Sequence, residues 1–263
     1  MNYGMRRLLA AWPWFVVAGI SVVVTLAVML PAAWIVPQFA KSTDGHVNLV
    51  DPAGSLWKGS ATLMLATGGG AGAADGATLL PGRIEWHTAF WPLFTGHVRM
   101  EMRQTQSMPD SVFVDASLSS STVSPGAIAV PASLLAGLGA PFNTLNMEGN
   151  VRLTWTEWRI LGQNTYGQVI VTLADMASSV SRVKPLGSYR VVFQAEGQAG
   201  TINLTTTSPG PLLLSGQGTV SKTSSAFNGV ATATPEAREN LAGLLNLLGR
   251  HTGPDTVELT FVR

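Results

Sequence analysis

The stretch LLAAWPWFVVAGISVVVTLAVMLPAAWIVPQFA, residues 8–40, carries no charge and decides which solvent the rest of the chain faces. A helix needs roughly 20 apolar residues to cross a hydrocarbon core about 30 Å thick. Residues 14–30 are apolar except for Ser21 and Thr25, so they lack the polar face of a soluble amphipathic helix. The sequence therefore predicts a single N-terminal transmembrane helix.

Basic residues flank this stretch unequally, with Arg6 and Arg7 before it and only Lys41 directly after it. The positive-inside rule then places the N-terminus in the cytoplasm and the C-terminal part on the export side. We expect residues 1–40 to form the cytoplasmic N-terminus and the anchor, and residues 41–263 to form one domain in the periplasm. A cleaved secretory signal is the alternative with the same orientation, although its apolar core usually has only about 7 to 15 residues.

The composition favours strands and turns over long helices. Only 12% of the 263 residues are charged, whereas 28 are Gly and 15 are Pro. The formal net charge of +1 provides no basic field for a nucleic-acid partner. The absence of cysteine excludes disulfides, thiolate zinc sites and a thiol nucleophile.

Apolar and polar residues alternate with a period of two over much of the chain after residue 83. Ile84 and Trp86, for example, alternate with Glu85 and His87. Such alternation indicates strands with one buried and one wet face, as in antiparallel sheets. Similar segments are residues 98–103, 111–118, 151–156, 168–173, 188–195, 201–206, 212–220, 227–233 and 256–262. The fold class is therefore mainly β, with a large curved antiparallel sheet, a sandwich or an open barrel.

Two segments break this period and predict short helices. Residues 130–138, VPASLLAGL, place Pro131 in a first helical turn. Residues 234–249, TPEARENLAGLLNLLG, offer Thr234 as N-cap and Gly249 as a stop. Four leucines of this second segment share one face, so we expect the helix to cover one end of the sheet. They are Leu241, Leu244, Leu245 and Leu248.

The residue types that carry catalysis or bind metals form no pattern in this sequence. The histidines are far apart and no H-E-x-x-H or G-x-S-x-G motif occurs. The acidic residues are scattered singly along the polar faces of strands, which gives no support to a glycan-active enzyme. We interpret the tryptophans of the domain as packing residues: Trp57, Trp86, Trp91, Trp155 and Trp158. No catalytic, metal or cofactor site is expected.

An ordered set of segments, preceded by the apolar stretch, resembles the type II secretion system protein N family, also called general secretion pathway protein N. The resemblance covers nearly the whole chain. It is carried by GSLWKGSA (54–61), LPGRIEWHTAFWPLFTG (80–96), LNMEGNVRLTW (145–155), DMASSVSRVKPLGSYRVVF (175–193) and FNGVATATPEARENLAGLLNLLGR (227–250).

The resemblance implies a non-enzymatic, single-pass protein of the bacterial inner membrane that assists export of folded proteins from the periplasm across the outer membrane. Its implied partners are the inner membrane and other type II secretion components, with no nucleic acid, small-molecule substrate or cofactor. The family-like positions include residues 81–86, residues 176–189 and a membrane-proximal turn. We predict this turn as a candidate partner contact, with Trp57 as its centre and Gly54, Leu56 and Gly59 around it.

An envelope lipid-binding protein is the alternative function. AsmA-like and lipopolysaccharide-bridge proteins hold acyl chains in an apolar β groove, and the period of two fits a groove as well as a closed core. The residues that would line such a groove are Val112, Val114, Val151, Leu153, Val191 and Phe193.

Overall fold

The computed structural model describes residues 18, 19, 21, 25, 29–43, 45–66, 77–138 and 142–262. Most of the predicted transmembrane segment, residues 14–30, lies outside these described residues. Among the helices that are described, none combines the length and the apolar character that a membrane crossing requires. The anchor therefore stays a prediction.

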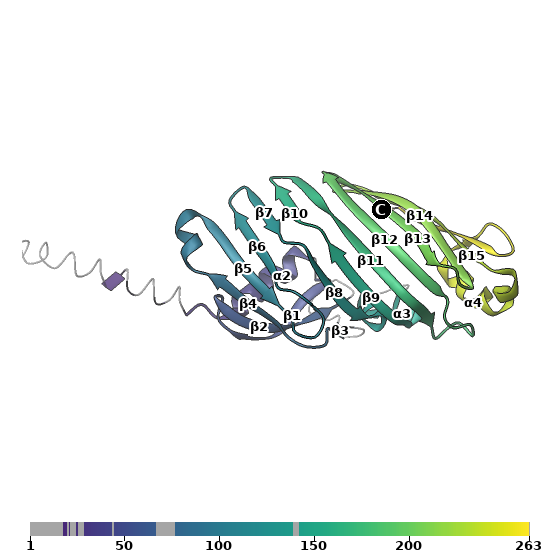
Figure 1. The fold of residues 1–263 in the computed structure, drawn as a ribbon, viewed down its shortest axis with the longest axis horizontal. Helices are drawn as coiled ribbons and strands as arrows, with labels where there is room; N and C mark the ends of the chain where they lie inside the picture. Colours follow the sequence, from purple (N-terminus) through teal and green to yellow (C-terminus); the bar gives the residue numbers. More distant parts are fainter. Residues whose placement is uncertain are drawn as a thin grey trace, which may run out of the picture.

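The described chain forms one antiparallel sheet of 17 strands, which confirms the mainly β class (Figure 1). The strands are β1 (Val47–Gly54), β2 (Lys58–Leu65), β3 (Thr78–Leu79), β4 (Ile84–Ala89), β5 (His97–Arg103), β6 (Val112–Ser117), β7 (Ser120–Val123), β8 (Gly126–Pro131), β9 (Met147–Trp155), β10 (Trp158–Leu161), β11 (Asn164–Ser178), β12 (Gly187–Gly197), β13 (Ala199–Ser208), β14 (Leu212–Ser221), β15 (Ser225–Ala233), β16 (Arg250–His251) and β17 (Thr256–Val262). The helical segments are η1 (Ala32–Trp34), α2 (Ile35–Ser42), η2 (Trp91–Thr95), η3 (Ala132–Leu138), α3 (Phe142–Leu145), η4 (Pro235–Ala237) and α4 (Arg238–Leu248).

The sheet is a meander, because strands that follow one another along the chain pair side by side. In the middle, β7 pairs with β10 while β8 pairs with β9. Both β9 and β10 then pair with the long strand β11, β10 with its first residues and β9 with the rest. Thus β10 and β9 lie one after the other along β11, and β7 and β8 lie one after the other along β10 and β9. The pairings begin with β1 in the N-terminal half of the elongated domain and end with β16 and β17 in the C-terminal half, where Figure 1 shows α4.

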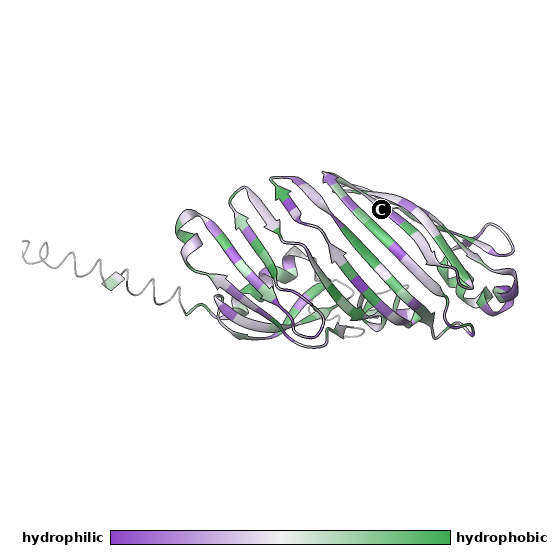
Figure 2. Ribbon diagram, viewed as in Figure 1, coloured by the Kyte–Doolittle hydropathy of each residue, from purple (hydrophilic) through white to green (hydrophobic). Residues whose placement is uncertain are grey.

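Alternation within the strands puts apolar side chains on one face of the sheet, and Figure 2 shows the hydrophobic and hydrophilic residues alternating along the strands. The register places Val171 of β11 between Leu153 of β9 and Val191 of β12. Val112 and Val151, two of the predicted groove residues, are only 2% and 1% exposed. The other four predicted groove residues are partly buried, and a lipid-holding role for this face stays a prediction.

The C-terminal end of this face is covered by α4, as the leucine pattern predicts. Leu241, Leu244 and Leu245 are at most 2% exposed and pack with Ala231 of β15 and Val257 of β17. Thr234 is the N-cap residue of the helical turn η4, as predicted, and it has an extended conformation there; its side chain makes no capping hydrogen bond.

The N-terminal end is covered by η1 and α2, which contain the last residues of the uncharged stretch and, in α2, Lys41 and Ser42 after it. Ala32 is buried with Ala61 of β2 and Trp86 of β4, and Ile35 packs against this cluster. Ala32 and Ile35, near the end of the stretch, therefore contribute to the packing of the β domain.

The structure corrects the predicted helix at residues 130–138. Val130 and Pro131 belong to β8, and the helical segment η3 begins at Ala132 as a 3₁₀ helix. Pro131 is tolerated in β8 because this strand, among those that the structure describes, pairs with β9 alone and so has an edge without a ladder.

Candidate functional site

The predicted contact turn joins β1 to β2, and its two glycines pair across the ladder. Gly54 has a φ of +86°, and a Cβ built there would lie 2.5 Å from the carbonyl oxygen of Lys58. A Cβ on Gly59 would lie 2.5 Å from Cζ2 of Trp86. Both positions therefore require glycine, one for its backbone angle and its close approach and the other for the space that the indole occupies.

Two side chains of β4 hold the carbonyl groups of this turn. The indole Nε1 of Trp86 donates to the carbonyl oxygens of Ser55 at 3.3 Å and Leu56 at 3.2 Å. The hydroxyl of Thr88 donates to the carbonyl oxygen of Leu56 at 3.1 Å, and the backbone N–H of Thr88 donates to that of Trp57 at 2.7 Å. Trp86 and Thr88 are buried, and their hydrogen bonds hold the turn against β4. Sequence reasoning missed these two partners because their hydrogen bonds join residues about 30 positions apart.

The N-terminal segment enters the domain at the same turn. The backbone N–H of Leu56 donates to the carbonyl oxygen of Leu30 at 2.9 Å. Pro31 forms an isolated antiparallel bridge with Ser55. The end of the predicted transmembrane segment is therefore attached one residue away from Trp57.

Trp57 is partly buried and lies at the base of a chain of aromatic rings. Its ring contacts Phe90 edge to face, with ring centroids 5.4 Å apart. Phe90 contacts Phe94 in the same way at 5.4 Å, and Phe94 contacts Trp91 at 6.0 Å. We call Trp57, Phe90, Trp91 and Phe94 the aromatic patch. Three of its members lie at the tip of the β4–β5 hairpin with 40%, 80% and 73% of their surface exposed, for Phe90, Trp91 and Phe94 respectively.

The aromatic patch bears on two predictions, the packing of the tryptophans and the contact residues of the turn. The packing interpretation of the tryptophans is confirmed for Trp86, which is 6% exposed, and is wrong for Trp91. Trp57 belongs to the patch through its contact with Phe90, while the other predicted contact residues, Gly54, Leu56 and Gly59, form the turn that carries Trp57. Contact with a partner through any of the four stays a prediction.

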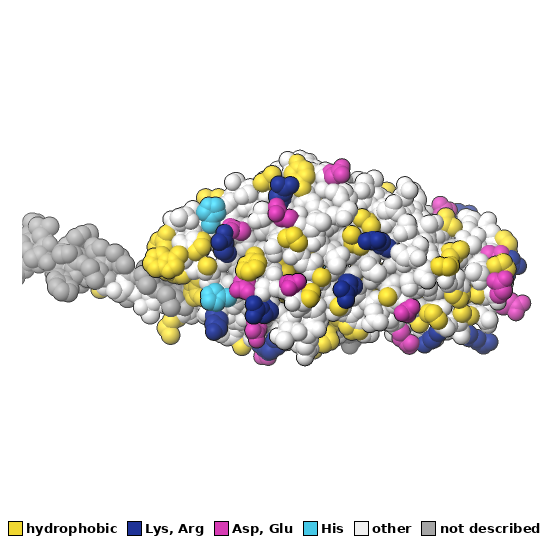
Figure 3. Space-filling view, in the orientation of Figure 1, with side chains coloured by type: hydrophobic (Ala, Val, Ile, Leu, Met, Phe, Trp, Pro, Cys, Tyr) yellow, Lys and Arg dark blue, Asp and Glu magenta, His cyan; other side chains and the backbone are white. Residues whose placement is uncertain are grey.

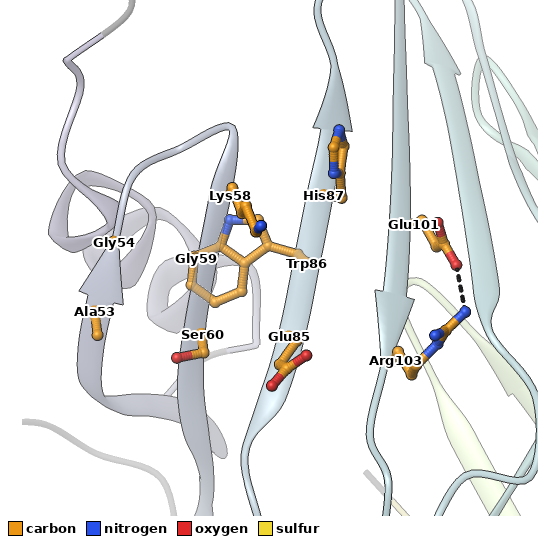
Figure 4. Close-up of a pocket in the computed structure, with 10 residues that line it drawn as sticks. All are labelled: Ala53, Gly54, Lys58, Gly59, Ser60, Glu85, Trp86, His87, Glu101 and Arg103. Atoms are coloured by element: carbon orange, nitrogen blue, oxygen red, sulfur yellow. Dashed lines mark hydrogen bonds and ion pairs between the residues drawn. The ribbon is translucent and has the colours of Figure 1, made fainter.

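A shallow hollow of about 500 Å³ lies next to the turn on the polar face of the sheet (Figure 4). Exposed Lys58, Glu85 and His87 border it, and Arg103 donates to Glu101 across 3.1 Å. Nearby charges are also paired, since Arg83 contacts Asp51 at 2.5 Å and donates to the hydroxyl of Ser60 at 3.1 Å. In the part of the chain that the structure describes, no three His, Asp or Glu residues are grouped as a metal site. The hollow can accept polar groups from another molecule by hydrogen bonding.

The second family-like region, residues 176–189, supports the middle of the sheet. Met176 is completely buried after a bulge in β11, where Asp175 has a φ of +51°. The hydroxyl of Tyr189, a residue 2% exposed, donates to the carbonyl oxygen of Leu212 at 3.0 Å. Burial raises the pKa of the Tyr189 phenol above its ordinary value, because the charged form loses its hydration. The buried side chains of this region, among them Met176, Leu186 and Tyr189, belong to the core clusters.

Comparison with protein-family models matches residues 45–260 to the family described as Type II secretion system (T2SS), protein N. The matched segment begins just before β1 and ends within β17, so it contains both the contact turn and the aromatic patch. The comparisons with curated proteins and with solved structures found no match.

Proposed function

Since the chain belongs to the type II secretion system protein N family, we propose that it is a non-enzymatic scaffold in the inner-membrane part of the secretion machinery. In this proposal residues 1–40 contain a single-pass anchor with a cytoplasmic N-terminus. Residues 41–263 form a periplasmic domain that contacts other secretion components and assists export of folded proteins across the outer membrane.

The observation that carries the proposal is the extent of the family match. Residues 45–260 include every strand of the meander at least in part, so membership applies to the whole sheet and not to a local motif. Participation in type II secretion follows from membership. A contact role is supported by the long antiparallel meander, whose polar face and exposed β4–β5 hairpin tip offer surface for binding.

The site chemistry supports contact in preference to catalysis. The hollow beside Gly59 contains ion-paired and hydrogen-bonded side chains, and Ser60 there accepts a hydrogen bond from Arg83. An activated serine needs a neighbouring general base, and the hydrogen bond to its hydroxyl oxygen here comes from an arginine, which cannot accept its proton.

The topology is tested by fusing alkaline phosphatase after Arg263 and washing the membranes with carbonate. We expect an active fusion in the periplasm and a full-length protein that stays with the membrane, because the uncharged stretch is long enough to span it. An inactive fusion would contradict the orientation. A soluble product shortened near Ala33 or Ala40 would show that the stretch is a cleaved signal.

The secretion role is tested by deleting the gene and restoring it in trans. We expect secreted proteins to accumulate in the periplasm of the deletion strain and export to recover on complementation. If secretion were unchanged while the lipid composition of the outer membrane altered, the scaffold proposal would be wrong and the lipid-groove alternative would replace it.

A further inference from the structure

We infer that the aromatic patch binds the periplasmic surface of the lipid bilayer, beside the point where the anchor leaves it. The inference rests on the anchored topology of the proposed function and adds a second, lipid-facing attachment of the β domain. It assigns Trp57, Phe90, Trp91 and Phe94 to the membrane interface.

The aromatic patch is exposed to solvent at its tip. Trp91 and Phe94 keep 80% and 73% of their surface in solvent although both are large and apolar. A contiguous patch of exposed apolar side chains on a folded domain marks a site that binds another protein or a membrane. Hydrophobic side chains also gather at the left-hand end of the domain, opposite to α4 (Figure 3).

The patch is also arranged in advance. Phe90 meets Trp57 at an interplanar angle of 76° and Phe94 at 80°, which are favourable edge-to-face geometries. The backbone of Trp57 is held in place, since its carbonyl oxygen accepts a hydrogen bond from the backbone N–H of Thr88 at 2.7 Å. Aromatic rings fixed in this way lose little conformational freedom when they are covered.

The position of the patch selects lipid as the binding partner. The carbonyl of Leu30, the last residue of the predicted transmembrane segment, bonds to Leu56 next to Trp57. A chain that leaves the bilayer at Leu30 therefore holds Trp57 close to the membrane surface. Tryptophan is enriched at this interface because one part of its ring is apolar and another is polar.

Polar side chains form the border that an interfacial surface needs. Exposed Lys58 directly follows Trp57, and long basic side chains reach the headgroup layer while their stems lie along apolar surface. On the other side of the patch, Arg99 is paired with Asp115 at 2.7 Å and His97 lies 3.9 Å from the same carboxylate. The apolar centre with a charged border matches the layered polarity of the interface.

The test uses the full-length chain in vesicles of phosphatidylethanolamine and phosphatidylglycerol. Because the natural sequence has no cysteine, a single Thr95→Cys change places an environment-sensitive fluorophore in η2 without removing a ring of the patch. Leu247→Cys, at an exposed position of α4 at the opposite end of the domain, is the matched control. Nitroxides carried on the lipid report the contact by quenching.

We expect lipid nitroxides to quench the probe at position 95 several-fold more strongly than the probe at position 247. The double change Trp91→Ser and Phe94→Ser in the Thr95→Cys chain should remove most of this quenching while the protein still floats with the vesicles. Equal, weak quenching at both positions of a floating protein would overturn the lipid inference alone. If lipid nitroxides did not quench the probe at position 95, and its fluorescence changed only when other secretion components were added, the inference would be overturned in favour of a protein partner. Failure of the full-length chain to float would overturn both the anchor and the lipid contact.

Discussion

The two ends of the β domain use their apolar side chains in opposite ways. At the C-terminal end, α4 buries three leucines to 2% exposure or less against β15 and β17. At the N-terminal end, the cluster around Ala32 and Trp86 is smaller, and the rings of Trp91 and Phe94 stay exposed next to it. The comparison teaches that a packed helix closes the C-terminal end, whereas the N-terminal end leaves large aromatic side chains exposed, for which contact with another molecule is our proposal.

The largest effect is expected from Leu244→Asp, which breaks the packed end. Leu244 is 2% exposed, and an unpaired carboxylate there costs several kcal/mol against a typical total of about 5 to 15 kcal/mol. We expect the cooperative thermal transition to be lost, as measured by circular dichroism. Leu247→Asp is the matched control, because this neighbour on α4 is 46% exposed and should change the melting temperature little. A normal transition for Leu244→Asp would mean that α4 is dispensable for the fold.

A smaller effect is expected at the other end from Gly59→Ala. The added methyl group would lie 2.5 Å from the indole of Trp86 and 2.7 Å from the carbonyl oxygen of Ser55, so the turn has to shift. Overpacking of this kind costs about 1–3 kcal/mol. Thermal unfolding should show a lower melting temperature, whereas Gly243→Ala in α4 should raise it, because nothing lies within 4 Å of that added methyl group and alanine favours helices. Equal melting temperatures for Gly59→Ala and the natural protein would show that the turn yields without cost.

The strands and α4 could be predicted because their signals are local. Alternation over five or more residues specifies a strand with one buried face, and the leucines of α4 repeat at helical spacing. The fold of β7, β8 and β10 could not be predicted in this way. β7 has the sequence SSTV, without alternation, and its place is set by pairing with β6 and β10.

The candidate site was predictable only in part, for a related reason. The glycines and Trp57 of the turn form a compact motif, but the roles of Trp86 and Thr88 depend on a strand about 30 residues away. Phe90, Trp91 and Phe94 form an apolar segment that is equally typical of a core. Whether such rings are buried depends on what packs over a hairpin tip, which the sequence of the hairpin does not specify.

The smallest expected effect sharpens the comparison through Tyr189, which ties the middle of the sheet to the C-terminal cluster. Its hydroxyl donates to the carbonyl oxygen of Leu212, a member of the cluster under α4, so Tyr189→Phe should lower the free energy of unfolding by about 1 kcal/mol at neutral pH.

Burial raises the pKa of Tyr189 in the folded state, so the folded protein retains this proton when the unfolded chain has lost it. The contribution of Tyr189 to stability is therefore complete below the unfolded pKa of about 10 and decreases as the pH rises above it. Denaturant unfolding between neutral pH and about pH 11 should show a steeper loss of stability for the natural protein than for Tyr189→Phe. Tyr166→Phe, at a side chain 38% exposed, is the matched control and should keep the steep profile. Parallel profiles for the natural protein and Tyr189→Phe would show that this phenol is ionised as readily in the sheet as in the unfolded chain, and that the C-terminal half of the sheet is more open to water than its packing indicates.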